Sequence, residues 1–241
     1  MNESQTTTNQ NADPLELQKF DALASRWWDP QGEFKPLHKL NPVRIAYVAA
    51  RAQLDGCQVL DIGCGGGLLS EGLAQQGATV TGIDMASGPL SVARLHQKKS
   101  GLDTIRYLQT TAEDLAEQEP ASFDVVTCME VIEHVPDPGS LIAACAQLVK
   151  PGGQVFLSTL NRNPKSFLLA IVGAEYIMQM LPKGTHEYER FVKPSELRRW
   201  GTTADLNFVE VCGLHYSALS GEFTLSDDVD VNYLMQFSAP A

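Results

Sequence analysis

Between residues 57 and 160, short apolar runs alternate with segments whose apolar residues recur at helical spacing. Strands that alternate with helices in this way pair in parallel through right-handed crossovers, with helices on both faces of the sheet. The expected strands are CQVLDI (57–62), ATVTGID (78–84), IRYL (105–108), FDVVTCM (123–129) and GQVFLST (153–159). The expected helices between them are 68–76, 88–99, 113–118 and 139–149. The pattern therefore predicts an α/β chain with a doubly wound, Rossmann-like sheet.

Helices are also expected before this alternation. Asp13–Pro14 and Asn41–Pro42 each combine an N-cap residue with a proline at the first helical position. One helix is predicted from this first pair to about Trp28, and a second from Asn41 onward. Residues 1–12 are polar and contain no Lys or Arg, which predicts a disordered tail without a targeting signal.

The pattern changes after residue 160. An insertion at 162–193 contains an apolar, helix-like stretch and a charged loop, and a short helix is expected from Ser195. Two further strands are expected within NFVEVCGL (207–214) and VDVNYLMQF (229–237). We therefore expect a mostly parallel sheet of about seven strands in a single domain that spans residues 13–241.

Charge and cysteine content restrict the class of protein. The chain has 18 Lys and Arg against 29 Asp and Glu, a formal net charge of -11. Because nucleic acids are bound through clustered cations, this balance argues against a nucleic-acid partner. Five cysteines without a C-x-x-C pair indicate free thiols in a reducing cytosol, so we expect a cytoplasmic protein.

A glycine-rich turn follows the first expected strand. Its sequence, VLDIGCGGG (59–67), contains a G-x-G-x-G pattern formed by Gly63, Gly65 and Gly67. Such a turn lets backbone N–H groups and a helix N-terminus approach a ligand closely. The dinucleotide fingerprint G-x-G-x-x-G would need a third glycine where Leu68 or Ser70 stands, which disfavours an NAD-dependent oxidoreductase.

Two more residues are expected beside this turn. Asp84 ends the second strand, where a carboxylate can accept both hydroxyls of a ribose, although a cap for the helix from Ser87 is an alternative. Met129 ends the fourth strand at the same crevice. Together with the Pro-Gly-Gly turn of LVKPGGQVFLST, these features resemble class I S-adenosylmethionine-dependent methyltransferases. The glycines are then expected to make room for the methionine part of the cofactor.

Longer segments resemble the ubiquinone-biosynthesis O-methyltransferases. The similar segments are FDALASRWWDPQGEFKPLHKLNPVRIAYV, TCMEVIEHVPDP, STLNRN, VGAEYIMQMLPKGTHEYERFVKP and GLHY, within residues 15 to 235. The resemblance implies methylation of phenol and catechol hydroxyls on polyprenylated precursors, at both O-methylation steps of the pathway. A methyltransferase for another small hydroxylated acceptor and a non-catalytic binding module are the alternatives.

The resemblance implies cofactor contacts at Arg44, Gly63, Asp84 and Met129, to which the loop residue Gly65 is added. Arg44 suits the methionine carboxylate in geometry, and a helix-surface arginine is the alternative. The thioether of Met129 can pack against adenine or the cofactor chain, and ordinary core packing is its alternative.

Three residues of the EVIEH stretch are candidates for catalysis. A phenol with a pKa near about 10 is mostly protonated at neutral pH, so a base or a metal ion would have to help remove its proton. Relatives are associated with a magnesium ion held by a set that corresponds to Glu130, Glu133 and His134. Alternatively, His134 alone is the base and the glutamates orient it, or the stretch is a solvated turn. These three alternatives stay open at this point.

The insertion at 162–193 differs in charge from the rest of the chain. It carries five basic and three acidic residues, a net charge of +2. An interfacial helix from about Ser166 to Leu181, flanked by lysines, would bind an anionic membrane surface, here the cytoplasmic face of the inner membrane. A lid helix over the substrate pocket is the alternative. Expected partners are thus the polyprenyl substrate, the membrane surface and other quinone-biosynthesis enzymes.

Overall fold

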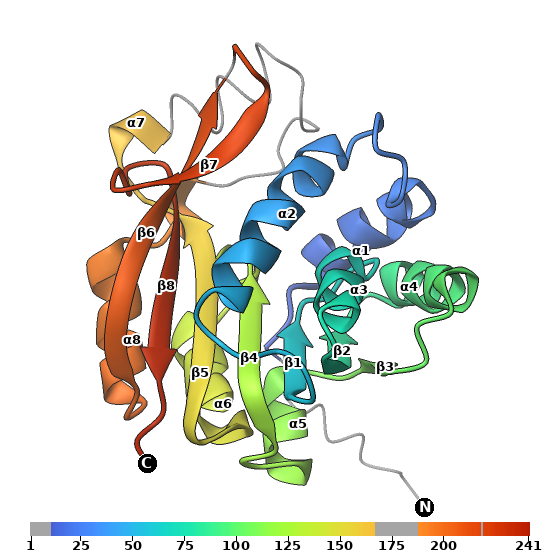
Figure 1. Ribbon diagram of the computed structural model, residues 1–241. Helices are drawn as coiled ribbons and strands as arrows, with labels where there is room; N and C mark the ends of the chain where they lie inside the picture. The colour runs from blue at the N-terminus through green and yellow to red at the C-terminus, as the bar shows by residue number, and fades with distance from the viewer. Residues whose placement is uncertain (1–10, 167–187, 218) are drawn as a thin grey trace, which may run out of the picture.

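The protein, seen here in a computed structural model, is described over residues 11–166, 188–217 and 219–241. Within these ranges the strands form one eight-stranded sheet in the order β3-β2-β1-β4-β5-β8-β6-β7 (Figure 1). Strands β1 to β5 pair in parallel, whereas β8 is antiparallel to β5 and β6, and β6 and β7 form an antiparallel hairpin. The strands are β1 (Gln58–Ile62), β2 (Thr79–Asp84), β3 (Ile105–Gln109), β4 (Phe123–Met129), β5 (Val149–Leu160), β6 (Asn207–Ser217), β7 (Glu222–Ser226) and β8 (Asn232–Ser238).

Helices cover both faces of the sheet, which confirms the predicted α/β class. The helices α2 (Lys35–Ala49), α3 (Leu68–Gln75) and α4 (Ser87–Ser100) share one apolar core with the strands. The helices α5 (Ala112–Gln118), α6 (Pro138–Leu148) and α8 (Pro194–Thr203) share the core on the other face. Because both faces are covered, β1 and β4 are buried along nearly their whole length, as their continuous apolar sequences predict.

The eighth strand, β7, was not predicted, because about seven strands were expected from continuous or alternating apolar runs. Its sequence, EFTLS, has exposed and half-buried residues and contains no such run. Among the described strands it pairs with β6 alone, from Gly213 opposite Ser226 to Ser217 opposite Glu222, and it also lies close to α2. An edge strand needs only one neighbour, so it leaves a weak apolar pattern in the sequence.

The predicted start of the second helix is wrong. α2 begins at Lys35 rather than at Asn41, with Pro36 in its first turn and Pro42 inside the helix. The Asn41 side chain does not cap the helix, because it donates a hydrogen bond of 2.8 Å to the carbonyl of Leu68. Asn41 thereby joins α2 to the start of α3.

The first helix is shorter than predicted, although its start is confirmed. α1 (Pro14–Leu23) begins after Asp13, whose side chain accepts a hydrogen bond from the backbone N–H of Leu15. A 3₁₀ turn (Ala24–Arg26) then follows, so Trp27 and Trp28 lie beyond the helix. α1 lies beside α4, near the edge of the sheet where β1 and β2 end (Figure 1).

Parts of the expected tail and insertion lie outside the described residues. Of the tail, residues 1–10 are outside, whereas the Asn11 side chain donates hydrogen bonds to Glu113 and to the carbonyl of Asp137. Of the insertion at 162–193, residues 167–187 are outside, including most of the expected interfacial helix. In the portions that the structure describes, no helix has both the length and the apolar character to cross a bilayer.

Candidate active site

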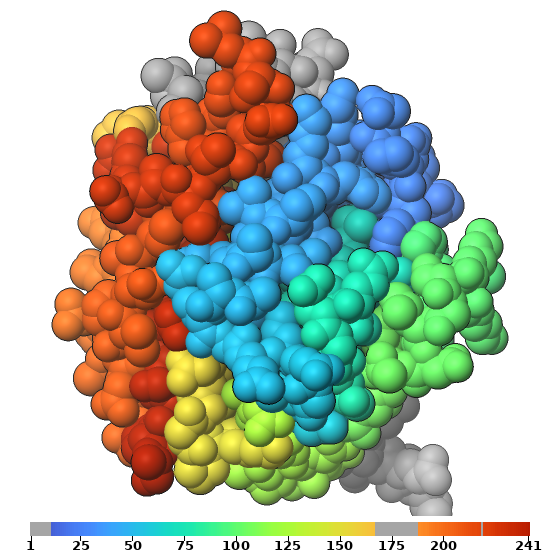
Figure 2. Space-filling model, in the orientation of Figure 1, coloured from blue at the N-terminus to red at the C-terminus, as the bar shows by residue number. Residues whose placement is uncertain are grey.

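A cavity of about 550 Å³ lies at the carboxyl ends of the parallel strands. The N-terminal segment with α1 and the start of α2 forms one wall, and residues of the β6–β7 hairpin form another. Figure 2 shows α2 on the surface between that hairpin and α3. Every residue predicted for the site lines this cavity: Arg44, Gly63, Gly65, Asp84, Met129, Glu130, Glu133 and His134. The fold therefore gathers residues that are up to 90 positions apart in sequence, from Arg44 to His134.

The glycine loop needs glycine for both its conformation and its close contacts. Gly63, Gly65 and Gly67 have positive φ angles of 68°, 53° and 88°, a region that other residues seldom adopt. A β-carbon on Gly63 would lie 2.2 Å from the Val131 side chain. The loop is held to the end of β2, because the backbone N–H groups of Gly63 and Cys64 both donate to the carbonyl of Ile83.

Trp27 packs directly on this loop. A β-carbon on Gly65 would lie 2.2 Å from Trp27 Cζ2, and one on Gly66 would lie 2.3 Å from Trp27 Cγ. The Trp27 ring is itself stacked on Phe34, with 4.1 Å between centroids. Because a helix was predicted as far as about Trp28, Trp27 was expected within that helix, and its contact with the glycine loop was missed. The N-terminal segment is thus one wall of the ligand cavity.

Trp28 also fixes the N-terminal segment to the glycine loop and to α4. Its indole N–H donates a 2.8 Å hydrogen bond to the carbonyl of Gly66. Its ring is stacked on His96, with 3.4 Å between centroids and 3° between planes. His96 also contacts the buried carboxylate of Glu71 at 2.8 Å.

The two oxygens of Asp84 hold the backbone at the end of β2. Oδ2 accepts a hydrogen bond from the N–H of Gly65 at 2.9 Å, and Oδ1 accepts from Ala86 at 2.8 Å. The first turn of α4 is bound instead by Asp21, which accepts from the N–H of Gly88. Burial raises the pKa of Asp84 against the lowering effect of these hydrogen bonds. Each carboxylate oxygen keeps a second lone pair, so Asp84 can also accept hydroxyl groups of a ligand.

Arg44 is buried at the cavity wall, which excludes the alternative of a helix-surface arginine. Its Nη2 lies 3.2 Å from Glu130 Oε1, at ion-pair distance but without hydrogen-bond geometry. Both Nε and Nη2 of Arg44 have no hydrogen-bond partner among the described residues. Buried donors without partners are costly, and a guanidinium matches a carboxylate in geometry. This side chain therefore fits a ligand carboxylate such as that of S-adenosylmethionine.

Glu130 turns the chain at the end of β4. Its φ angle of 57° is in the left-handed region, which is strained for a residue with a side chain and frequent at functional sites. Glu130 Oε1 accepts a 2.6 Å hydrogen bond from Ser158, and Oε2 accepts a 3.1 Å hydrogen bond from Asn232. Both oxygens are thus occupied by protein groups.

Glu133 and His134 follow in a 3₁₀ turn (Ile132–His134) but face different partners. Glu133 Oε2 accepts a 2.7 Å hydrogen bond from Thr159, and burial raises the pKa of this carboxyl. His134 Nδ1 lies 2.8 Å from Oε2 of Glu16, a residue of α1. Burial would lower the pKa of His134, but the hydrogen bond to Glu16 and the nearby carboxylates raise it above its ordinary value. The same hydrogen bond lowers the pKa of Glu16 to about 2.

The arrangement of Glu130, Glu133 and His134 does not support a magnesium site. Within the described ranges, no group of three or more His, Cys, Asp or Glu residues is placed to hold a metal ion. Glu130 is bound by Ser158 and Asn232, and His134 is bound by Glu16. Magnesium needs near-ideal octahedral coordination by oxygen, and in this set only Glu133 Oε1 has no hydrogen-bond partner among the described residues.

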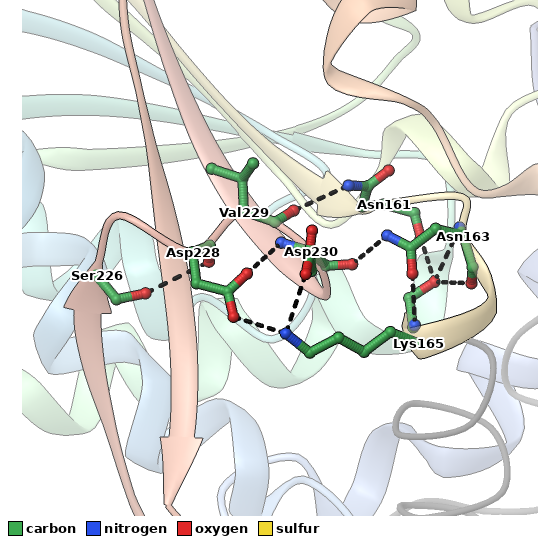
Figure 3. Close-up of polar contacts among 8 residues, drawn as sticks. Asn161, Asn163, Lys165, Ser226, Asp228, Val229 and Asp230 are labelled. Atoms are coloured by element: carbon green, nitrogen blue, oxygen red, sulfur yellow. Dashed lines mark hydrogen bonds and ion pairs between the residues drawn. The ribbon is translucent and has the colours of Figure 1, made fainter.

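A polar network joins the start of the insertion to the loop before β8 (Figure 3). Lys165 Nζ lies 2.6 Å from Asp228 and 3.0 Å from Asp230. The Asn161 side chain donates to the carbonyl of Val229, and Asn163 donates to the carbonyl of Asp230. Lys165 and Asp228 also line the cavity, so this network holds the described start of the insertion at the cavity wall.

Comparisons with known proteins show the family and the fold of the chain. Residues 60–157 match a family described as methyltransferase domain. The ubiquinone biosynthesis O-methyltransferase of Pseudomonas entomophila is 59% identical over 226 residues, which are 94% of this chain and 97% of that protein. The protein of the same name from Hahella chejuensis is 58% identical over 234 residues, 97% of this chain and 98% of its own length.

Solved structures show the same fold at low identity. The magnesium protoporphyrin IX methyltransferase of Synechocystis PCC 6803, solved with bound SAH, has a TM-score of 0.66 at 19% identity. The match covers 92% of this chain and 94% of that chain. A possible histamine N-methyltransferase from Thermotoga maritima has a TM-score of 0.65 at 18% identity, covering 93% and 98% of the two chains.

Proposed function

Because the chain belongs to the family of ubiquinone biosynthesis O-methyltransferases, we propose that it methylates phenol and catechol hydroxyls of polyprenylated ubiquinone precursors. S-adenosylmethionine supplies the methyl group, and the proposal includes both O-methylation steps of the pathway. The observation that supports it most is that residues suited to bind the cofactor and a residue suited to act as a base line the same cavity. Arg44, Asp84 and the glycine loop fit a cofactor with a carboxylate and a ribose, and His134 lines the same cavity, which supports a role for it in removing the hydroxyl proton.

We assign a separate role to each residue proposed to bind the cofactor. Arg44 pairs with the methionine carboxylate, and Asp84 accepts the ribose hydroxyls. Met129 packs its thioether against the cofactor, beside Gly63 and Gly65. The bound cofactor presents an electrophilic methyl group on a sulfonium centre. Alignment of the acceptor oxygen with that carbon and the sulfur supplies much of the acceleration, because the reaction is an in-line displacement.

We propose that His134 is the general base. It takes the hydroxyl proton while the oxygen forms its bond to the methyl carbon and the carbon–sulfur bond breaks, with that electron pair going to sulfur. Glu133 and Glu130 act on the base through their nearby negative charges. No step is assigned to magnesium. Full turnover in excess chelator is the expected result, and loss of turnover that magnesium restores would overturn this assignment.

The insertion at 162–193 is proposed to contact the anionic cytoplasmic face of the inner membrane. Three of its four described cations are already paired: Arg162 with Glu196, Lys165 with Asp228 and Asp230, and Arg190 with Asp13. Burial of apolar residues, rather than charge, is therefore the main support for membrane contact. Co-flotation with anionic liposomes tests it, and a protein that ignores liposomes at low salt would leave the lid alternative. Contacts with other quinone-biosynthesis enzymes are proposed from the family alone.

One assay series separates the candidate functions. We expect calorimetric binding of S-adenosylmethionine but not of NAD, followed by turnover of a catechol with a short prenyl tail. Binding without turnover of any hydroxylated acceptor would indicate a non-catalytic module. Turnover of small phenols without preference for the prenyl tail would favour the alternative, a methyltransferase for another hydroxylated acceptor.

A further inference from the structure

Within the described part of the chain, the proposed base makes its polar contact with the N-terminal helix α1. Glu16 Oε2 lies 2.8 Å from His134 Nδ1, across 118 residues of sequence. Glu16 is 7% exposed, and both residues line the cavity. Its other oxygen, Oε1, lies 2.6 Å from Lys19 Nζ one turn further along α1. Phe20, also on α1, packs edge-on against the His134 ring at 5.4 Å between centroids. One helix therefore fixes the imidazole by a hydrogen bond and by ring packing.

We infer that Glu16 is the positioning residue of the base, a role that rests on the proposed methyl transfer. A neutral imidazole carries one proton, and a carboxylate beside Nδ1 holds that proton there. Nε2 is then the unprotonated nitrogen and accepts the proton of the acceptor hydroxyl. The imidazolium that forms is stabilised by the negative charge of Glu16, as in the carboxylate–histidine pairs of hydrolases. The imidazolium returns to the neutral form when it releases the proton to solvent.

The two glutamates next to His134 in sequence do not make this contact. The hydrogen bonds of Glu130 come from Ser158 and Asn232, and that of Glu133 comes from Thr159. Their charges act on His134 only through space, whereas Glu16 contacts the ring nitrogen directly. The orienting role that the sequence suggested for Glu130 and Glu133 therefore moves to a residue of α1.

Glu16→Gln is the test, because it keeps the shape of the side chain and removes its charge. With a prenylated catechol, we expect kcat to fall about 100-fold, within the range that general bases contribute, while the Kd for S-adenosylmethionine is unchanged. The control Glu117→Gln, an exposed carboxylate on α5, should leave both values as they are. Turnover by the wild-type protein tests the methyltransferase function itself. If the wild type turns over and Glu16→Gln shows no defect, only the role of Glu16 is contradicted.

Acceptor acidity separates positioning of a base from a purely structural role. Across a series of ring-substituted catechols, the kcat defect of Glu16→Gln should shrink as the phenol becomes more acidic, because less help is needed to remove the proton. A defect of constant size, or no defect, would overturn the inference. Folding of the variant is checked by thermal unfolding.

A second measurement does not depend on turnover. In ¹⁵N-histidine-labelled protein at alkaline pH, the resonances of His134, assigned by their loss in His134→Ala, should report the Nδ1–H tautomer. In Glu16→Gln the population of the Nε2–H tautomer should rise, because a neutral amide no longer selects the Nδ1 proton. An Nε2–H tautomer in the wild-type protein would also overturn the inference.

Discussion

The indole ring of Trp27 lies where a β-carbon of Gly66 would have to be, with Trp27 Cδ1 and Cγ only 2.3 Å from that position. Gly66 has no positive φ angle, so this close approach alone requires glycine. Gly66→Ala should therefore displace Trp27 and destabilise the fold by about 1–3 kcal/mol. Denaturant unfolding, followed by tryptophan fluorescence, measures the change. Gly139→Ala is the control, because its β-carbon would meet no atom closer than 3.3 Å. In a Trp27→Ala background Gly66→Ala should cost less, and equal costs would contradict the explanation.

Asp84→Asn should weaken cofactor binding. The amide keeps one acceptor oxygen but loses the charge-assisted hydrogen bonds to ribose, worth roughly 1.5–3 kcal/mol, so the Kd rises about 10- to 100-fold. Because Asp84 also accepts from Gly65 and Ala86, a modest fall in melting temperature should accompany it. Titration calorimetry of the folded variant measures the affinity. The exposed Asp103→Asn should bind like the wild type, and an unchanged Kd for Asp84→Asn would remove this residue from the ribose site.

Arg44→Lys tests the proposed pairing with the cofactor carboxylate. Lysine keeps the charge but cannot form the two parallel hydrogen bonds of a guanidinium, so the Kd for S-adenosylmethionine should rise by about tenfold. The matched ligand is decarboxylated S-adenosylmethionine, which lacks the paired group. Wild type and variant should bind this ligand with similar affinity, and an equal loss for both ligands would point to a distorted pocket instead.

The pair of Glu16 and His134 should make stability depend on pH. The pKa of Glu16 falls from 4.5 to about 2 on folding, so its contribution is complete above pH 4.5 and is lost as the pH drops through about 2. The pKa of His134 rises above 6.5 on folding, so its contribution is complete below pH 6.5 and is lost as the pH rises through the folded value. Glu16→Gln should therefore lower the melting temperature most between pH 4.5 and 6.5. A difference of melting temperatures that stays constant into alkaline solution would contradict the ion pair.

The elements that could be predicted from sequence were those with a strong local pattern. The buried parallel strands and the helices between them lie within a few residues of their expected limits, because apolar runs and helical spacing are local properties. The edge strand β7 and the early start of α2 could not be predicted in this way. β7 depends on pairing with β6, and Asn41 bonds to Leu68 rather than to its own helix.

In the candidate site too, residues marked by a local motif were predicted, whereas residues that depend on contacts between distant segments were not. Arg44, the glycine loop, Asp84, Met129 and His134 were found because motif and resemblance mark them, and all line one cavity. The roles of Glu16 and Trp27 were missed because each depends on how α1 and the following turn fold back onto distant residues. Nothing in the local sequence distinguishes Glu16 from a solvated helix carboxylate. Only its burial and its contact with His134 do so.

The position of the N-terminal segment has a consequence for what this chemistry depends on. The general methyltransferase module, residues 60–157, contains the glycine loop, Asp84 and His134. Arg44, Trp27 and Glu16 all precede it in the chain. The matched segment thus contains the proposed ribose contact and the proposed base, whereas the segment before it contains the residues proposed to pair with the cofactor carboxylate and to position the imidazole. Binding of the cofactor and removal of the acceptor proton therefore both depend on how the N-terminal segment packs against the matched segment.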